Sequence, residues 1–332
     1  MTPPAGALRS ARGPDNHSRA RVHLLIPTHT TRHLALCLAG VAAQTRPPAT
    51  VVLTCDTDDP AVGEVAAETW ARVGESLAGR GLEPPPLVFT CRPHAGEARL
   101  NQVRNNGLRA LEARGAARDE DLVVVIDGDM LLAPDALGRH ARLRDAGYEL
   151  IIPYRVDLDP DTTTEVSLDS LLGPDAGTAI GRFARPSRLA PLGARDRRYR
   201  RQLLLRRLGL TKGHKPKVLG GHHAVSVRLL RAINGYDEGY TGYGYDDDDL
   251  SRRLHALRPR VRAAIAVREI VAYHLWHPSR APARPIDAPG FQRFSRADLP
   301  VVAAEGWHSP APQPAPEAAV IDAGERPSAR SL

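Results

Sequence analysis

Aromatic side chains and long apolar runs are scarce in this sequence. Aromatic residues make up 5% of its 332 positions. The longest apolar runs, such as 22–27 and 122–126, are far shorter than the ~20 residues that cross a membrane. The first 21 residues contain no apolar segment like that of a secretory signal. We therefore expect a cytoplasmic protein. Its 42% hydrophobic and 25% charged residues are ordinary for a globular chain.

Cysteine is also rare. Cys37, Cys55 and Cys91 are widely spaced and include no CxxC pair, so they do not resemble a zinc site. An odd number of cysteines does not form a complete set of disulfides. We expect buried free thiols in a reducing compartment.

The positive charge is concentrated in one segment. Residues 182–217 contain 13 Lys and Arg and one acid, Asp196, so this segment has a net charge of +12, and the rest of the chain, at +7 overall, has −5. A solvated helix, docking to an anionic membrane surface or acceptor, and nucleic-acid binding all fit such a segment. Its apolar residues include Leu203, Leu204, Leu205 and Leu208. Because only Tyr199 is available to stack on bases, nucleic acid is the least favoured partner.

Strand and helix patterns alternate through the first half of the chain. The expected strands are 22–27, 50–56, 86–91, 121–130 and 149–155, and the expected helices are 32–44, 61–79, 95–115 and 134–146. This order predicts an α/β fold with a mostly parallel sheet and helices on both faces. Ligands of such sheets bind beyond the carboxyl ends of the strands. Pro27, Thr28 and Asp56 stand at two of those ends.

Two acids follow the most apolar of these strands. Asp127 and Asp129 share one face of an extended chain, and Gly128 between them leaves room for a ligand. Carboxylate oxygens suit Mg²⁺ or Mn²⁺ bound to a phosphate, although surface turns also produce a DxD pattern.

Two histidines close a later apolar segment. His274 and His277 are three residues apart and flank Trp276. A packed core residue and a cap at the end of a strand are the alternative roles of these two histidines. As metal ligands beside carboxylates, they would favour Mn²⁺ over Mg²⁺.

Four consecutive acids begin an expected helix at 247–257. At 100° per residue, its apolar stripe is formed by Leu250, Leu254 and Leu257. This phase predicts that Asp246 and Asp247 lean toward the interior, that Asp248 points to water, and that Asp249 lies to the side. Simple capping of the helix would explain one or two acids. The glycines before the helix, Gly239, Gly242 and Gly244, suggest a loop that folds over a bound donor.

The sequence resembles two groups of glycosyltransferases. Residues 24–56, 104–111 and 123–130 look like a GT-A glycosyltransferase of the family 2 type. Residues 220–254 and the HLWH at 274–277 are similar to the β-1,4-galactosyltransferases and bacterial polysaccharide polymerases. Together the resemblance covers roughly 21–278, apart from the basic segment.

This resemblance implies a metal-dependent inverting glycosyltransferase with a UDP-sugar donor. It implies that Asp56 contacts the uridine, that Arg104 lies near the nucleotide, and that Asp247 is the catalytic base while Asp246 holds the acceptor. It also implies a Mn²⁺ (or Mg²⁺) site. The residues implied for that site are Asp129, His277 and His274, with Asp127 as the first acid of the DxD. Tyr243 stands where the family has a tryptophan, next to Gly244.

Composition, together with the resemblance, suggests a division of the chain. The expected parts are a disordered N-terminus at 1–20, a nucleotide-sugar-binding half at 21–155, a variable basic segment at 156–217, an acceptor-binding and catalytic half at 218–280, and a loose Pro/Ala-rich tail at 281–332. UDP-Gal, UDP-GalNAc, UDP-GlcNAc and UDP-Glc all fit as donors. The acceptor is a saccharide, a lipid-linked sugar or a small molecule. The alternatives are a metal-dependent phosphohydrolase and a basic protein that binds nucleic acid or an anionic surface. The phosphohydrolase would require a denser ligand set or a nucleophile.

Overall fold

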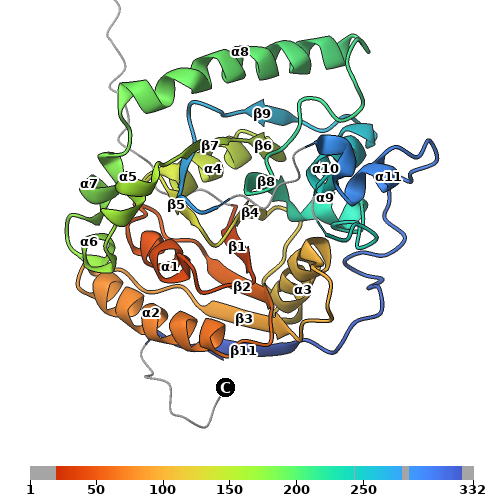
Figure 1. Cartoon of the computed structure of the whole chain (residues 1–332). Coiled ribbons are helices and arrows are strands. Elements are labelled where there is room, and N and C mark those ends of the chain that lie inside the picture. The colour runs from red at the N-terminus through yellow and green to blue at the C-terminus, as the bar shows by residue number, and fades with distance from the viewer. Residues whose placement is uncertain (1–19, 243, 279–283, 324–332) are drawn as a thin grey trace, which may run out of the picture.

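The computed structural model describes residues 20–242, 244–278 and 284–323. The expected disordered N-terminus falls almost entirely outside these residues, and so does Tyr243. Within them, eight strands form a sheet in the order β11-β3-β2-β1-β4-β8-β6-β9, and three more form a sheet in the order β5-β10-β7. Figure 1 shows the large sheet through the middle of the molecule with helices around it.

The strands of the large sheet are β1 (Val22–Thr28), β2 (Thr50–Asp56), β3 (Leu87–Arg92), β4 (Leu122–Ile126), β6 (Leu150–Ile152), β8 (His222–Ser226), β9 (Ala263–Ile265) and β11 (Glu317–Ile321). Those of the small sheet are β5 (Met130–Leu132), β7 (Tyr154–Asp157) and β10 (Val271–His274). The helices are α1 (Leu34–Ala42), α2 (Ala61–Ala78), α3 (Leu100–Ala113), α4 (Ala136–Asp145), α5 (Pro160–Thr164), α6 (Leu168–Leu172), α7 (Ala176–Gly181), α8 (Pro186–Arg207), α9 (Val227–Ala232), α10 (Asp246–Ala256) and α11 (Gly290–Phe294), with a 3₁₀ turn at Pro285–Asp287.

Helices cover both faces of the large sheet because its strands are apolar on both sides. Along β1, Leu24 and Ile26 belong to a core with α1, α2 and α4, whereas Leu25 belongs to a second core with α3, α9 and α10. Successive side chains of a strand point to opposite faces, so one apolar strand supplies both cores. The expected α/β class is confirmed: a central sheet is flanked by helices.

The expected parallel sheet is interrupted at β8, and the pair β6 and β9 beyond it is parallel again. Strands β3, β2, β1 and β4 are parallel neighbours, whereas β8 runs antiparallel to both β4 and β6. The expected strand at 149–155 is in fact two strands in different sheets, because the chain leaves the large sheet at Pro153. The strand-like segment 260–278 divides in the same way into β9 and β10.

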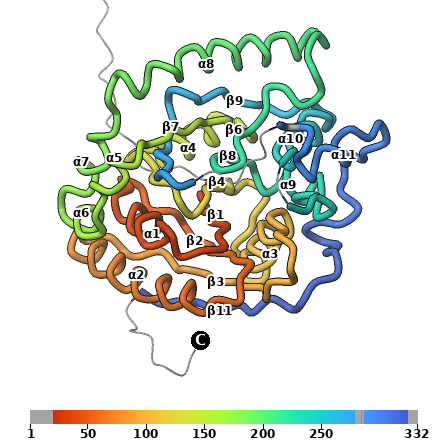
Figure 2. Tube along the Cα trace, in the orientation of Figure 1, coloured from red at the N-terminus to blue at the C-terminus, as the bar shows by residue number. Residues whose placement is uncertain are grey.

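The C-terminal segment is not a loose tail in its described part, 284–323. It forms α11, it adds β11 antiparallel to β3 at the edge of the large sheet, and its Trp307 is 1% exposed. The prediction was wrong because the Pro- and Ala-rich composition hides a short edge strand and one large core side chain. Figure 2 shows this segment running from α11 back to β3.

The basic segment contains the long helix α8. In Figure 1 this helix runs along the upper edge of the molecule above β9. Its inner face buries Leu192, Asp196 and Tyr199, and most of its arginines face outward. Within the described ranges, no helix combines the length and the apolar character that crossing a membrane requires.

Candidate active site

The predicted nucleotide-binding residues do meet at the carboxyl ends of the parallel strands. Pro27 and Thr28 end β1, and Pro27 is in register with Thr54 of the neighbouring β2. Gly128 follows β4, and a side chain at this position would lie 3.0 Å from Thr28 Oγ1. Absence of a side chain at Gly128 therefore lets the β1 and β4 ends approach each other closely.

Asp56, at the end of β2, is held by donors from β3 and the chain that follows it. Its carboxylate lies 2.9 Å from His94 Nδ1 and 3.3 Å from Arg92 Nη2, and it accepts the backbone N–H of Arg99 at 3.3 Å. Asp56 is 7% exposed. No local pattern in the sequence pointed to Arg92 or His94. The register that places Arg92 beside Asp56 is the signal that would have identified the arginine.

The three predicted metal ligands form a cluster. Asp129 Oδ2 lies 3.0 Å from His277 Nε2 and 3.4 Å from His274 Nε2, and one ligand atom from each residue lies within 4.8 Å of the others. The register of the small sheet explains this, because His274 of β10 pairs with Met130, the residue after Asp129. Asp129 Oδ1 is buried and has no hydrogen-bond partner among the described residues. One carboxylate with an unused oxygen and two imidazoles fits Mn²⁺.

A second carboxylate orients one of these histidines. Asp157 of β7 is in register with His274, and its Oδ1 lies 3.0 Å from His274 Nδ1. This contact turns Nε2 toward Asp129, as carboxylates do behind metal-bound histidines. Arg155 pairs with the same Asp157 at 3.0 Å. Burial lowers the pKa of His274, but its hydrogen bonds to Asp129 and Asp157 outweigh this and raise that pKa to about 9 when no metal is bound. Asp157 was missed because nothing in its local sequence distinguishes it.

The two predicted catalytic acids lie at the start of α10, beside a buried arginine. Arg104 of α3 is 1% exposed, and its Nη1 lies 2.8 Å from Asp246 Oδ2 and 3.9 Å from Asp247 Oδ1. Asp247 Oδ2 accepts the backbone N–H of Gly220 at 2.8 Å. A methyl group at Gly220 would collide with the Asp247 carboxylate, and one at Gly221 would lie 2.6 Å from Asp127 Oδ2. Gly220 and Gly221, which have no side chains, thus separate the DxD from the acids of α10.

Burial raises the pKa of Asp247 well above its usual value, and the negative charge of Asp246 raises it further, although Arg104 opposes both effects. Burial and the neighbouring Asp129 likewise raise the pKa of Asp127 to about 6. A carboxylate with a raised pKa is a stronger proton acceptor once it is ionised.

The predicted exposure of Asp248 was wrong. Asp248 does not point to water: it is 8% exposed, and it pairs with Lys217 at 2.9 Å and Lys215 at 3.4 Å. Asp249 is fully buried between Arg252 and Arg253, each at 2.7 Å. Leu250 and Leu254 are buried, as the predicted apolar stripe requires, but α10 is covered on more than one side, because the chain before β8 packs over the start of the helix.

The glycine-rich loop before α10 packs against the C-terminal segment. Gly244 has a φ of 97°, which other residues rarely adopt, and a side chain there would lie 3.0 Å from Ala288 Cβ. Arg293 of α11 binds Asp237 at the start of the loop at 2.8 Å. The predicted donor contact of Tyr243 lies outside the described residues.

The cysteines are free, as predicted. Cys37 and Cys55 are buried, and Cys91 is partly buried. Cys55 and Cys91 are neighbours across β2 and β3.

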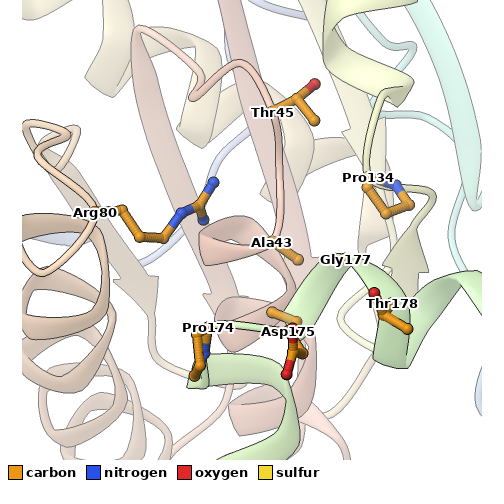
Figure 3. A pocket seen from close by; sticks show the side chains of 9 residues that line it. Ala43, Thr45, Arg80, Pro134, Pro174, Asp175, Gly177 and Thr178 are labelled. Atoms are coloured by element: carbon orange, nitrogen blue, oxygen red, sulfur yellow. The ribbon is translucent and has the colours of Figure 1, made fainter.

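A hollow of about 190 Å³ lies away from these residues (Figure 3). It is lined by Ala43 and Thr45 after α1, and by Arg80, Pro134 and residues of α7. Because α1 runs back from the carboxyl end of β1, this hollow is near the amino ends of the strands. The Arg80 guanidinium is bonded to the Ala42 carbonyl, and no predicted site residue lines the hollow.

One protein family matches part of this chain. Residues 210–275 match a family model described as the N-terminal domain of galactosyltransferase. This range includes Asp246, Asp247 and His274, and it ends two residues before His277. The predicted resemblance to galactosyltransferases is confirmed for these residues, and the match favours the predicted enzyme class, a glycosyltransferase. No curated protein sequence matches the chain.

Several solved structures are similar. TarS 1-349 of S. aureus in complex with UDP-GlcNAc has 12% identity and a TM-score of 0.46, and the match covers 83% of this chain and 64% of that one. GalNAc-T7 with UDP, GalNAc and Mn²⁺ has 13% identity and a TM-score of 0.43, with 78% and 44% covered. A mycobacterial protein has 14% identity and a TM-score of 0.38, with 83% and 76% covered. The chain thus spans less than two thirds of the first two.

Proposed function

We propose that this protein transfers a hexose or N-acetylhexosamine from a UDP-sugar to a hydroxyl group, with inversion and with the help of a divalent metal ion. One observation supports this function above the others. Asp127 of the DxD lies against Gly221 and Asp247 of α10 against Gly220, while the second acid of the DxD, Asp129, lies with His274 and His277 in a group able to bind a metal.

The donor would bind across the strand ends. Asp56, fixed by Arg92 and His94, is placed to accept hydrogen bonds from the uracil or ribose, and Thr28 and Asp127 line the path toward the diphosphate. Asp129, His274 and His277 would hold Mn²⁺ or Mg²⁺, which neutralises charge on the departing diphosphate.

Asp247 would take the proton of the acceptor hydroxyl as the acceptor oxygen attacks the anomeric carbon of the donor. The new C–O bond forms on the face opposite the diphosphate, the bond to the diphosphate oxygen breaks, and UDP leaves with that electron pair. Asp246 would orient the acceptor. The ion pair with Arg104 at 2.8 Å holds Asp246 in place, and the N–H of Gly220 does the same for Asp247.

The acceptor would be a saccharide, lipid-linked or small-molecule hydroxyl. A lipid-linked acceptor lies in a membrane, and the inner membrane face is the site of action we propose in that case. Nucleic acid has no role in this function.

Release of UDP from UDP-Gal, UDP-GalNAc, UDP-GlcNAc and UDP-Glc tests the proposal. With Mn²⁺, one of these donors should stabilise the protein against heat, by about 2.7 kcal/mol at a hundred times its Kd, and should be hydrolysed slowly by water. The anomeric configuration of the product, followed by NMR, should be inverted. If no donor releases UDP and none stabilises the protein with Mn²⁺, the proposed function is wrong.

A further inference from the structure

The outward face of α8 combines positive charge with exposed apolar side chains. At 100° per residue, one sector about 60° wide contains Ala190, Gly193, Arg197, Leu204 and Leu208. Leu204 is 57% exposed and Leu208 is 65% exposed, and Leu210 just after the helix is 68% exposed. The buried residues of α8 point the other way, so this sector faces away from the core.

Two arginines beside this face have no partner. Arg197 of α8 and Arg268, in the turn after β9, are both exposed. Neither makes a hydrogen bond or an ion pair within the described ranges. Arg200 and Arg188 of the same helix, by contrast, are paired with Asp196 and Asp159. Two free guanidinium groups that flank one site are well suited to bind an oxyanion such as phosphate.

An apolar hollow lies between these arginines. Its volume is about 480 Å³. It is lined by Ala184, Pro186, Leu189, Ala190, Leu192 and Gly193, with Arg197 and Arg268. No acid is among the lining residues, so nothing there would repel an anion. A ligand that is anionic at one end and hydrocarbon at the other matches this lining.

We propose that the outward face of α8 lies on a bilayer that contains anionic lipids, and that Arg197 and Arg268 bind the phosphate of one lipid whose acyl chain enters the hollow. The exposed leucines Leu204, Leu208 and Leu210 enter the interface further along. From Gly193 to Leu208 the helix extends about 22 Å, so several headgroups lie under it.

Charge and shape favour this partner over an acidic polymer. The segment 182–217 has a net charge of +12, whereas the rest of the chain has −5, so an anionic surface would attract one side of the molecule and repel the others. A soluble polyanion would make no use of three exposed leucines or of an apolar hollow. An interfacial helix uses both.

Sedimentation with vesicles tests the surface. The protein should bind vesicles of phosphatidylcholine mixed with phosphatidylglycerol, and not vesicles of phosphatidylcholine alone. Each basic residue near an anionic surface strengthens binding roughly fivefold. The double variant Arg197→Gln/Arg268→Gln, which lacks two of them, should therefore bind about 30-fold more weakly. Leu204→Ser/Leu208→Ser should weaken binding by a similar factor while the charge is unchanged. As a matched control, Arg114→Gln/Arg118→Gln removes two exposed positive charges outside α8 and should bind as the wild type does.

A short-chain phosphatidylglycerol, used below its micelle-forming concentration, tests the single-lipid site. Calorimetry should show saturable binding of one molecule per protein, and no binding of the matching phosphatidylcholine. Gly193→Leu fills the hollow without altering charge. It should abolish this binding but largely retain vesicle binding.

Equal binding to neutral and anionic vesicles would overturn the whole proposal. So would a Leu204→Ser/Leu208→Ser variant that still binds anionic vesicles as tightly as the wild type and is displaced from them more strongly by heparin. Vesicle binding without saturable short-chain binding would overturn the single-lipid site. Hydrolysis of the UDP-sugar in the absence of vesicles should be the same in all these variants, so failure here is distinguishable from failure of the proposed reaction.

Discussion

Replacing Asp247 with Asn should lower the rate of sugar transfer by ~10²–10⁴-fold, the range for loss of a positioned acid or base. The substitution keeps the size of the side chain and its capacity to accept the Gly220 N–H, but it removes the proton acceptor. Binding of UDP with Mn²⁺ should be nearly intact, because the proposed diphosphate site is on the other side of Gly220 and Gly221. Steady-state kinetics and calorimetric titration with UDP check the two parts.

The pH profile distinguishes a base from a residue that only holds the helix. A base acts when it is ionised, so the wild-type kcat/KM should fall as pH drops through the raised pKa of Asp247. The Asn variant should lack that decrease.

Asp248→Asn is the matched control. It breaks the pairs with Lys215 and Lys217, so we expect a lower Tm with transfer retained. If Asp248→Asn reduces transfer as much as Asp247→Asn does while both proteins melt normally, the base has been assigned to the wrong residue.

Removing a predicted metal ligand should uncouple UDP binding from Mn²⁺. Loss of a residue that only orients a metal ligand lowers metal affinity roughly 10–100-fold. Because Asp129 and His277 are predicted to be ligands themselves, Asp129→Ala or His277→Ala should lower Mn²⁺ affinity by more than this. EDTA should no longer change the affinity of these variants for UDP. That affinity should equal the low affinity that the wild-type protein has for UDP in EDTA. Manganese binding can be followed directly by electron paramagnetic resonance, without reference to activity.

A graded series makes this result specific. Asp157→Asn weakens the contact that turns His274 toward Asp129, and it should reduce Mn²⁺ affinity by roughly 10–100-fold. His308→Ala removes a partly exposed histidine that lies 3.8 Å from Glu112, and it should change nothing. If the wild-type protein binds UDP equally tightly with and without EDTA, the metal assignment is wrong.

Much of the fold was predictable because its signals are local. The strand expected at 50–56 is β2 with the same bounds, and the helix expected at 247–257 is α10 shifted by one residue. A short apolar run between two helical patterns forms a buried strand in almost any order of the strands in the sheet. The grouping of Asp129, His274 and His277 was predictable for a related reason, since each of the three stands at the end of such a run.

Other features depend on residues that are distant in the sequence. Arg92 and His94 reach Asp56 only because β3 pairs with β2 in one register, and Asp157 reaches His274 only because β7 pairs with β10. The orientation of Asp248 required knowing that Lys215 and Lys217, some thirty residues earlier, pack over the start of α10. No local pattern contains these contacts.

The sequence by itself determined the two-sided apolar strands, the helix that follows the four acids, and the uneven distribution of charge, because each depends on residues close together in the chain. The tertiary structure alone decided which acids are exposed, that the C-terminal segment completes the sheet through β11 and buries Trp307, and that Arg197 and Arg268 flank one apolar hollow. The physical reason is that burial and pairing depend on which distant surface covers a side chain, and that surface exists only once the strands have been ordered into a sheet.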